Sequence, residues 1–386
     1  MSEPALLQKS PPRLLSLDVF RGITVAAMIL VNNPGDWGHI YPPLEHAEWN
    51  GCTPTDLIFP FFLFIVGVSI SFALGSKKEI EADHNKLLWT AAKRTLILFC
   101  LGLVIHSFRT LLKDPSLVLP TLRIPGVLQR IALVFFITAV FFVKTSTKTQ
   151  FRALVAILIS YWIIMAFIPV PGYGPANLEK ETNMGAWIDR GIFSEAHLWS
   201  ASKTWDPEGL LGTLPAVATG LFGLLVGTWL KRKDRDDAVK ISWMFSIGFL
   251  AVILGLVWDL FFPINKALWT SSYVLFAGGL ATISLAFCYW IIDVNRYKSA
   301  TKPFVVFGVN AIAVFFLSAI IPQIINLIKL SAPTGEKLGL IPYAYQTFIA
   351  PNFSAVNASL VYAVTFDLIW LLILWVMYNK KIIIKV

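Results

Sequence analysis

The chain has 386 residues, of which 56% are hydrophobic and only 14% charged, and it contains 29 Phe and 14 Trp. An average soluble chain is about a quarter charged, so this composition excludes a soluble globular protein and indicates a membrane protein. The net charge of +9 does not point to nucleic acid, because the cations lie in short polar breaks between apolar runs.

About ten apolar runs are long enough to cross the hydrocarbon of a bilayer, which requires roughly 20 helical residues each. They lie near 17–33, 55–75, 94–112, 125–143, 153–170, 210–230, 239–262, 271–292, 303–328 and 354–378. The sequence therefore predicts an all-α, polytopic integral membrane protein with about ten transmembrane helices.

Lys and Arg concentrate in alternate breaks, such as SKKEIEADHNK, KTSTKTQFR and KRKDRDDAVK. Such asymmetry sets orientation, so we expect these breaks and both termini on the cytoplasmic side. The start of the chain shows no apolar segment followed by a cleavage site, and we expect no cleaved signal peptide. The predicted location is a bacterial inner membrane, crossed many times.

No fixed-period repeat is visible, which favours a single transmembrane domain over 1–386. Two segments, near 34–54 and 171–209, are too long for simple connectors, and we expect both outside the cell membrane. Cys52, Cys100 and Cys288 lie far apart, so neither a disulfide framework nor a metal site is expected.

The first long loop holds the densest group of titratable residues, with His39 and His46 beside Asp36 and Glu45. Histidine suits general acid–base work near neutral pH, so a loop histidine at the membrane mouth is a candidate base. A solvated loop histidine is the alternative. Asp56, at the start of the second run, either supports the helix N-terminus or orients His46.

Ionisable and amide side chains inside apolar runs are costly and usually face a cavity or a partner. The chain has several: Asp18, Arg21, Asn32, Asn33, Asp56, His106, Asn310 and Asp367. Asp18 and Arg21 share a helical face, which fits a local ion pair or contact with an anionic ligand.

At the start of the fourth run, Arg123, Gln129 and Arg130 cluster, either as residues that reach the interface or as contacts to a polar ligand. The outer tryptophans form an interfacial belt, or one or two of them stack on a sugar ring. They are Trp37, Trp49, Trp187, Trp199, Trp205 and Trp269.

Eight stretches together resemble the transmembrane part of the heparan-alpha-glucosaminide N-acetyltransferases and their bacterial relatives. They are LDVFRG (17–22), VNNPG (31–35), EHAEWNGCTPTDLIFPFFLFIVG (45–67), RIPGVLQRIA (123–132), WIDRGIF (187–193), WDPEGLLGTLPA (205–216), PINKALWTSSYV (263–274) and FGVNAIAVF (307–315). Their order and spacing cover nearly the whole chain.

The resemblance implies transfer of an acetyl group from cytoplasmic acetyl-CoA to the amine of a glucosamine residue on the far side of the membrane. The family's active-site histidine falls on His46, and neighbouring polar residues fall on Asn32 and Asp56. The animal enzymes have a large luminal domain without counterpart here, so the expected acceptor is a free amino sugar, a cell-wall fragment or another glycan.

In this scheme His46 removes the amine proton or briefly carries the acetyl group, and the Asn32 amide stabilises the oxyanion. Arg21, with Asp18, Lys93 and Arg94, is expected at the phosphate-bearing end of CoA. The acceptor would lie near the long outer loop. Candidate contacts are Arg123, Gln129, Arg130, Asp189, Arg190, His197, Asp206, Glu208, Asn265, Lys266 and Asn310.

Two other functions fit the same sequence features. One is a transporter of amino sugars, since ten helices with buried polar residues also describe a carrier. The other is an enzyme that acylates a hydroxyl group of a glycan. The expected partners are the acceptor and the lipid bilayer, with no nucleic acid; a homodimer is left open.

Overall fold

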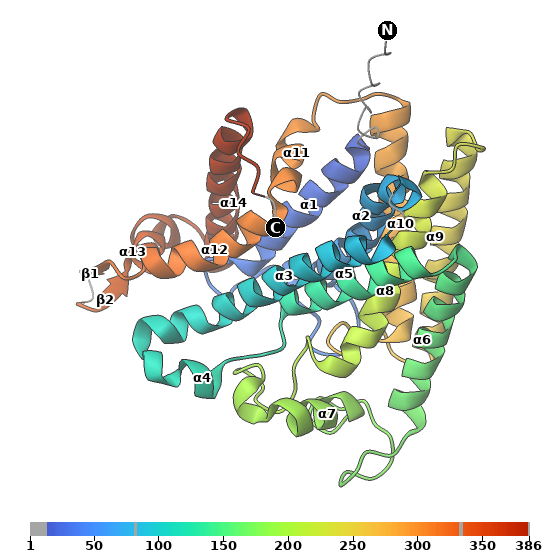
Figure 1. Cartoon of the computed structure of the whole chain (residues 1–386). Coiled ribbons are helices and arrows are strands. Elements are labelled where there is room, and N and C mark those ends of the chain that lie inside the picture. Colours follow the sequence, from blue (N-terminus) through green and yellow to red (C-terminus); the bar gives the residue numbers. More distant parts are fainter. Residues whose placement is uncertain (1–13, 81–82, 332–334, 385–386) are drawn as a thin grey trace.

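The computed structural model describes residues 14–80, 83–331 and 335–384 (Figure 1). The expectation about a signal peptide concerns mainly residues outside these ranges. The α-helices are α1 Leu15–Asn32, α2 Ile58–Ile80, α3 His84–Lys113, α4 Val118–Thr121, α5 Val127–Lys144, α6 Thr147–Phe167, α7 Met184–Phe193, α8 Leu210–Leu230, α9 Asp237–Asp259, α10 Ser271–Tyr289, α11 Lys302–Val309, α12 Ala311–Ile325, α13 Leu340–Ala344 and α14 Ala355–Asn379.

Sheet is a minor part of the described residues. Strands β1 Lys329–Ser331 and β2 Lys337–Gly339 pair antiparallel, with Lys329 opposite Gly339. Short 3-10 turns cover Pro42–Leu44, Thr55–Leu57, Pro115–Leu117, Glu195–His197 and Ala350–Asn352, and π-helical turns cover Trp290–Val294 and Tyr345–Ile349.

The all-α polytopic fold predicted from the apolar runs is confirmed. Within the described ranges, nine helices are long and apolar enough to span a membrane, and α11 with α12 makes up to ten if this bent pair crosses once. Two helices begin before the apolar runs predicted at 94–112 and 153–170, since α3 starts at His84 and α6 at Thr147. Their first turns are polar, and hydropathy does not register them.

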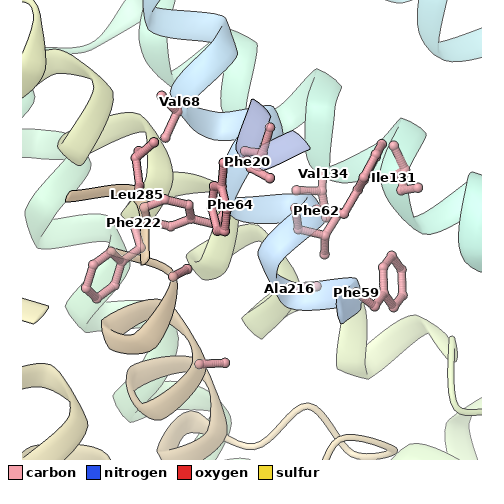
Figure 2. Close-up of a cluster of buried hydrophobic side chains, with 14 of the residues drawn as sticks. Phe20, Phe59, Phe62, Phe64, Val68, Ile131, Val134, Ala216, Phe222 and Leu285 are labelled. Atoms are coloured by element: carbon pink, nitrogen blue, oxygen red, sulfur yellow. The ribbon is translucent and has the colours of Figure 1, made fainter. Parts of the chain in front are cut away.

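Helices α2 and α8 form the centre of the bundle. Gly67 and Gly223 let the two backbones approach so closely that a Cβ at either would lie 2.0 Å from a carbonyl oxygen of the other helix. Small residues allow this approach in membrane bundles. Around them pack Phe59, Phe64 and Phe222 (Figure 2), and α1, α5 and α10 surround this core.

The run predicted as one helix over 303–328 is broken at Asn310, where α11 and α12 meet at 76°. The Asn310 amide donates to Ile382 O at 3.1 Å and accepts from Ile384 N at 2.9 Å. Figure 1 shows the chain after α14 returning toward α11. At the break, the Asn310 side chain thus binds the backbone of the returning segment. The apolar sequence pattern does not reveal this contact.

Candidate active site

Residues 33–54 link α1 to the turn before α2 and are held by contacts with distant parts of the chain. Gly51 N donates to Ile264 O at 2.7 Å, and Asn265 Nδ2 donates to Asn50 Oδ1 at 3.1 Å. Trp49 Nε1 donates to Leu178 O at 2.9 Å. The loop is therefore fixed against the segments that follow α6 and α9.

His46 and Asp56 form a close pair at the start of the α2 span. His46 Nδ1 lies 2.6 Å from Asp56 Oδ1, with the imidazole 50% exposed and the carboxylate only 1% exposed. Asp56 Oδ2 accepts from Ala47 N and Thr53 N, each at 3.0 Å. The Thr53 hydroxyl lies 3.1 Å from the same oxygen, so this carboxylate oxygen is held by three donors.

A buried carboxylate fixed by backbone donors holds the imidazole in one orientation and favours a proton on Nδ1. The other ring nitrogen, Nε2, is then left as a proton acceptor or nucleophile. Tyr273 lies behind the pair and donates its hydroxyl to Asp56 O. Sequence reasoning missed Tyr273, although it lies in the stretch PINKALWTSSYV.

His39 and Asp36 form a second pair in the same loop, 2.8 Å apart, and both side chains are about half exposed. The hydrogen bond to His39 holds the pKa of Asp36 below its usual range, with help from Gly38 N. The two pairs have the same chemistry, so burial of the carboxylate is what distinguishes His46.

Cys52, between His46 and Asp56 in sequence, is a thiol rather than a thiolate at neutral pH. Burial raises its pKa to about 12, and the nearby charge of Asp56 adds to the effect. Because the thiolate is the nucleophilic form, Cys52 is poorly suited to carry an acyl group.

Asn32 ends α1 with an exposed side chain that makes no hydrogen bond to other described residues. Its amide is accordingly accessible to a ligand. Asn33, the next residue, donates to Ile29 O and belongs to the helix end.

Two of the residues expected at the CoA end, Arg21 and Arg94, line one cavity of about 470 Å³. Arg21 donates to Ser69 Oγ at 3.0 Å and pairs with Asp18 at 3.3 Å, which is one of the two arrangements that the spacing allowed. Lys93 is not among the lining residues, and its ammonium lies over the Trp89 ring. We call this the donor cavity.

The donor cavity runs beside α2 from Leu74 to Phe62, which is about 18 Å at the rise of an α-helix. Gly308, Val309 and Ala311 close one wall, together with Ile383 and Ile384 of the returning segment. Asn310, which we expected to bind the acceptor, lies beside the donor cavity. Both ends of its amide are hydrogen-bonded to the backbone of Ile382 and Ile384.

Residues 168–209 connect α6 to α8, and two acceptor candidates of this segment, Asp206 and Glu208, form an ionic network with Arg123. Its guanidinium donates to both carboxylate oxygens of Asp206 and to Glu208. Burial opposes the charge of Arg123, but the two carboxylates outweigh it and raise its pKa. Burial likewise disfavours ionised Glu208, yet Lys266, Arg123 and Arg130 keep its pKa low.

Most other acceptor candidates also hold loops together. Arg190 donates to Glu181 O and Thr204 O, and His197 Nδ1 lies 2.8 Å from Leu122 O. Asp189 Oδ1 accepts from Leu210 N at the start of α8. Asn265 bonds Leu268 N as well as Asn50.

Gln129 and Arg130 remain partly unsatisfied. Arg130 donates one hydrogen bond, to Gly209 O, and its guanidinium lies over the Trp269 ring. Both amide atoms of Gln129 and two guanidinium nitrogens of Arg130 are buried without a partner among the described residues. Such groups need water, a ligand or a rearrangement to be satisfied.

Among the outer tryptophans, three contact one another and one is buried. Trp49, Trp205 and Trp199 make edge-to-face contacts at 5.1 and 5.7 Å. Trp269 is fully buried and donates to Thr219 Oγ1, so it cannot face lipid headgroups or a sugar.

The fold and the site define a polytopic membrane protein that presents a fixed histidine–aspartate pair at one end of its bundle. The sequence model of the family described as "Heparan-alpha-glucosaminide N-acetyltransferase, catalytic" matches residues 13–262. The chain belongs to this family.

Two curated relatives extend the match over the whole chain. Human heparan-alpha-glucosaminide N-acetyltransferase is 30% identical and aligns with 98% of this chain and 61% of its own length. The mouse enzyme is 28% identical and aligns with 100% of this chain and 62% of its own length. The chain thus spans about three fifths of the relatives it matches.

Proposed function

We propose that the protein is a membrane-embedded N-acetyltransferase that moves an acetyl group from acetyl-CoA to the amine of a glucosamine-type sugar. The observation that carries the proposal is the His46–Asp56 pair, with its buried carboxylate and half-exposed imidazole. The family name supports an amino-sugar acceptor.

His46 is the base in this reaction. The sugar nitrogen attacks the thioester carbonyl, a C–N bond forms, and the amine proton passes to His46 Nε2. The C–S bond then breaks, and the imidazolium returns the proton to the departing thiolate of CoA. Asp56 keeps the ring oriented and stabilises its charged form, while the exposed Asn32 amide donates to the oxyanion.

A transient acetyl group on His46 Nε2 is compatible with the same geometry. In that route Nε2 attacks the thioester first, the C–S bond breaks, and CoA leaves as the thiolate. The amine then takes the acetyl group as the bond to the ring breaks, and its proton passes to the freed Nε2 and on to the thiolate. Rapid quenching with labelled acetyl-CoA distinguishes the two routes by the presence or absence of labelled protein.

CoA would enter through the donor cavity, with its phosphates near Arg21 and Arg94. The cations of the polar breaks support a cytoplasmic position for this end, in the inner membrane of a bacterium. The cavity lining ends at Phe62, which lies about 9 Å along α2 from Asp56, so the acetyl end has to pass Phe62.

The acceptor would approach His46 from the opposite end of the bundle, beside Trp49 and the 168–209 segment. Arg130 and Gln129 are candidate contacts, because four of their buried polar atoms have no partner in the described part of the chain. Lys266, Asp189, Arg190, His197, Asp206 and Glu208 would act mainly by holding the surrounding loops.

The test uses purified protein with acetyl-CoA and glucosamine, and it follows thiol release and N-acetylated product. We expect activity that falls by at least about 10²-fold in His46→Ala. The matched control is His39→Ala, which removes the exposed histidine of the second pair and should retain activity.

Two outcomes would contradict the proposal. Uptake of unmodified glucosamine into proteoliposomes without thiol release would identify a transporter. Equal activity on N-acetylglucosamine, whose amine is blocked, would identify an O-acyltransferase.

A further inference from the structure

A long apolar groove runs along the outside of the bundle between α6 and α9. Its volume is about 920 Å³, its walls come from α6 and α9, and its floor comes from α8 and α10. Val155 and Leu254 stand on opposite walls, and Phe222 lies on the floor. Figure 1 shows α6 and α9 on the same side of the molecule.

The groove is long enough to hold a lipid chain. Along α9 it extends from Trp243 to Trp258, which is about 22 Å of helix. One leaflet contributes about half of a 30 Å hydrocarbon layer, so an acyl chain can lie along the groove within the membrane.

One end of the groove is cationic. Lys148 and Arg152 lie one turn apart at the start of α6, both line the groove, and both are exposed. Neither has a carboxylate or hydrogen-bond partner among the described residues, and no Asp or Glu lines the groove. The N-terminus of α6 adds a partial positive charge at the same place.

Two tryptophans lie at the same end. The Trp229 and Trp243 rings are 5.7 Å apart and both line the groove. Tryptophan prefers the headgroup level of a bilayer, which places this end at the interface. Cationic residues over an apolar channel at headgroup depth match a phosphate attached to acyl chains.

We propose that this groove binds an anionic phospholipid, with its phosphate on Lys148 and Arg152 and an acyl chain between α6 and α9. A second copy of the protein fits less well. A two-fold axis along the membrane normal would bring the cations of both copies to the same depth, with no carboxylate among the residues that line the groove to pair them.

The test is native mass spectrometry of the full chain from a mild detergent, with phosphatidylglycerol or phosphatidylcholine of identical acyl chains. We expect wild type to retain phosphatidylglycerol roughly tenfold better. The Lys148→Gln/Arg152→Gln variant should lose this preference. The control variant Lys233→Gln/Lys298→Gln removes two exposed cations that do not line the groove and should keep it.

A second variant tests the groove without touching the charges. Leu254 is 48% exposed, so Leu254→Trp fills the channel with little effect on packing and should weaken phosphatidylglycerol retention. Equal retention of both lipids by wild type would overturn the proposal. So would a lipid-free dimer that Leu254→Trp dissociates, because the occupant would then be a second copy.

Discussion

The imidazole of His46 is hydrogen-bonded to one carboxylate oxygen of Asp56, and the other oxygen of Asp56 accepts from two backbone N–H groups. Asp56→Asn keeps an oxygen for those donors but offers His46 an amide N–H in place of an acceptor. The ring would then turn or change tautomer, so we expect kcat to fall by roughly 10²–10⁴-fold.

The measurement is kcat for acetyl transfer with both substrates saturating. The matched control is Asp36→Asn, which makes the same change in the exposed pair with His39. A similar small loss in both variants would mean that Asp56 does not orient the base.

Arg21 and Arg94 line the donor cavity, and in the proposed reaction they contact the phosphates of CoA. Removal of the Arg21 guanidinium should weaken donor binding, so Arg21→Ala should raise KM for acetyl-CoA by about tenfold and leave KM for glucosamine unchanged. Lys93→Ala is the control, because Lys93 is next in sequence to Arg94 but does not line the cavity. A rise in both KM values would point to a general structural loss.

Acetyl-pantetheine, which lacks the nucleotide, separates phosphate binding from other effects of the substitution. Its KM should be the same in wild type and in Arg21→Ala. A rise with this donor as well would place the role of Arg21 elsewhere than at the phosphates.

Contacts between residues that are close together in the sequence could be anticipated from their spacing. His46 and Asp56 lie ten residues apart in one stretch, and Asp18 and Arg21 lie one helical turn apart, so the sequence offered each contact as one of two alternatives. Hydropathy predicted the apolar spans, because a bilayer imposes a minimum length on each helix.

Long-range contacts could not be predicted in this way. Arg123 and Asp206 are 83 residues apart, and nothing in either stretch specifies the partner of the other. The helix break at Asn310 lies in a continuous apolar run, and only the returning segment near Ile382 explains it. The burial of Trp269 similarly depends on Thr219, 50 residues away.

Arg123 ties two loops together through buried charges. Arg123→Ala would leave Asp206 and Glu208 buried without their cation, which typically costs about 3–5 kcal/mol. We expect a clear fall in the thermal midpoint in detergent. Arg232→Ala, which breaks an exposed, solvent-screened pair with Asp234, should leave the thermal midpoint nearly unchanged. Equal shifts would mean that the buried network adds no stability.

Asp189 should make stability depend on pH. Burial raises its pKa to about 7 from an ordinary value of 3.8, although the hydrogen bond from Leu210 N opposes the rise. Between these values the folded state binds more protons than the unfolded state. The free energy of unfolding should therefore fall as pH rises from about 4 to about 8, by at most about 4 kcal/mol.

Asp189→Asn removes this titration while its side-chain oxygen still accepts from Leu210 N. The variant should match wild type near pH 4 and be more stable at pH 8, as measured by the thermal midpoint. Asp36→Asn is the control with the opposite effect. The pKa of Asp36 is lowered in the folded state, so its ionised form stabilises the fold at neutral pH, and the Asn variant should lose this stability at pH 8. If Asp189→Asn instead lost stability at pH 8, the ionised carboxylate would be part of the folded network, and its partner would be sought in Arg130, which lines the same small cavity.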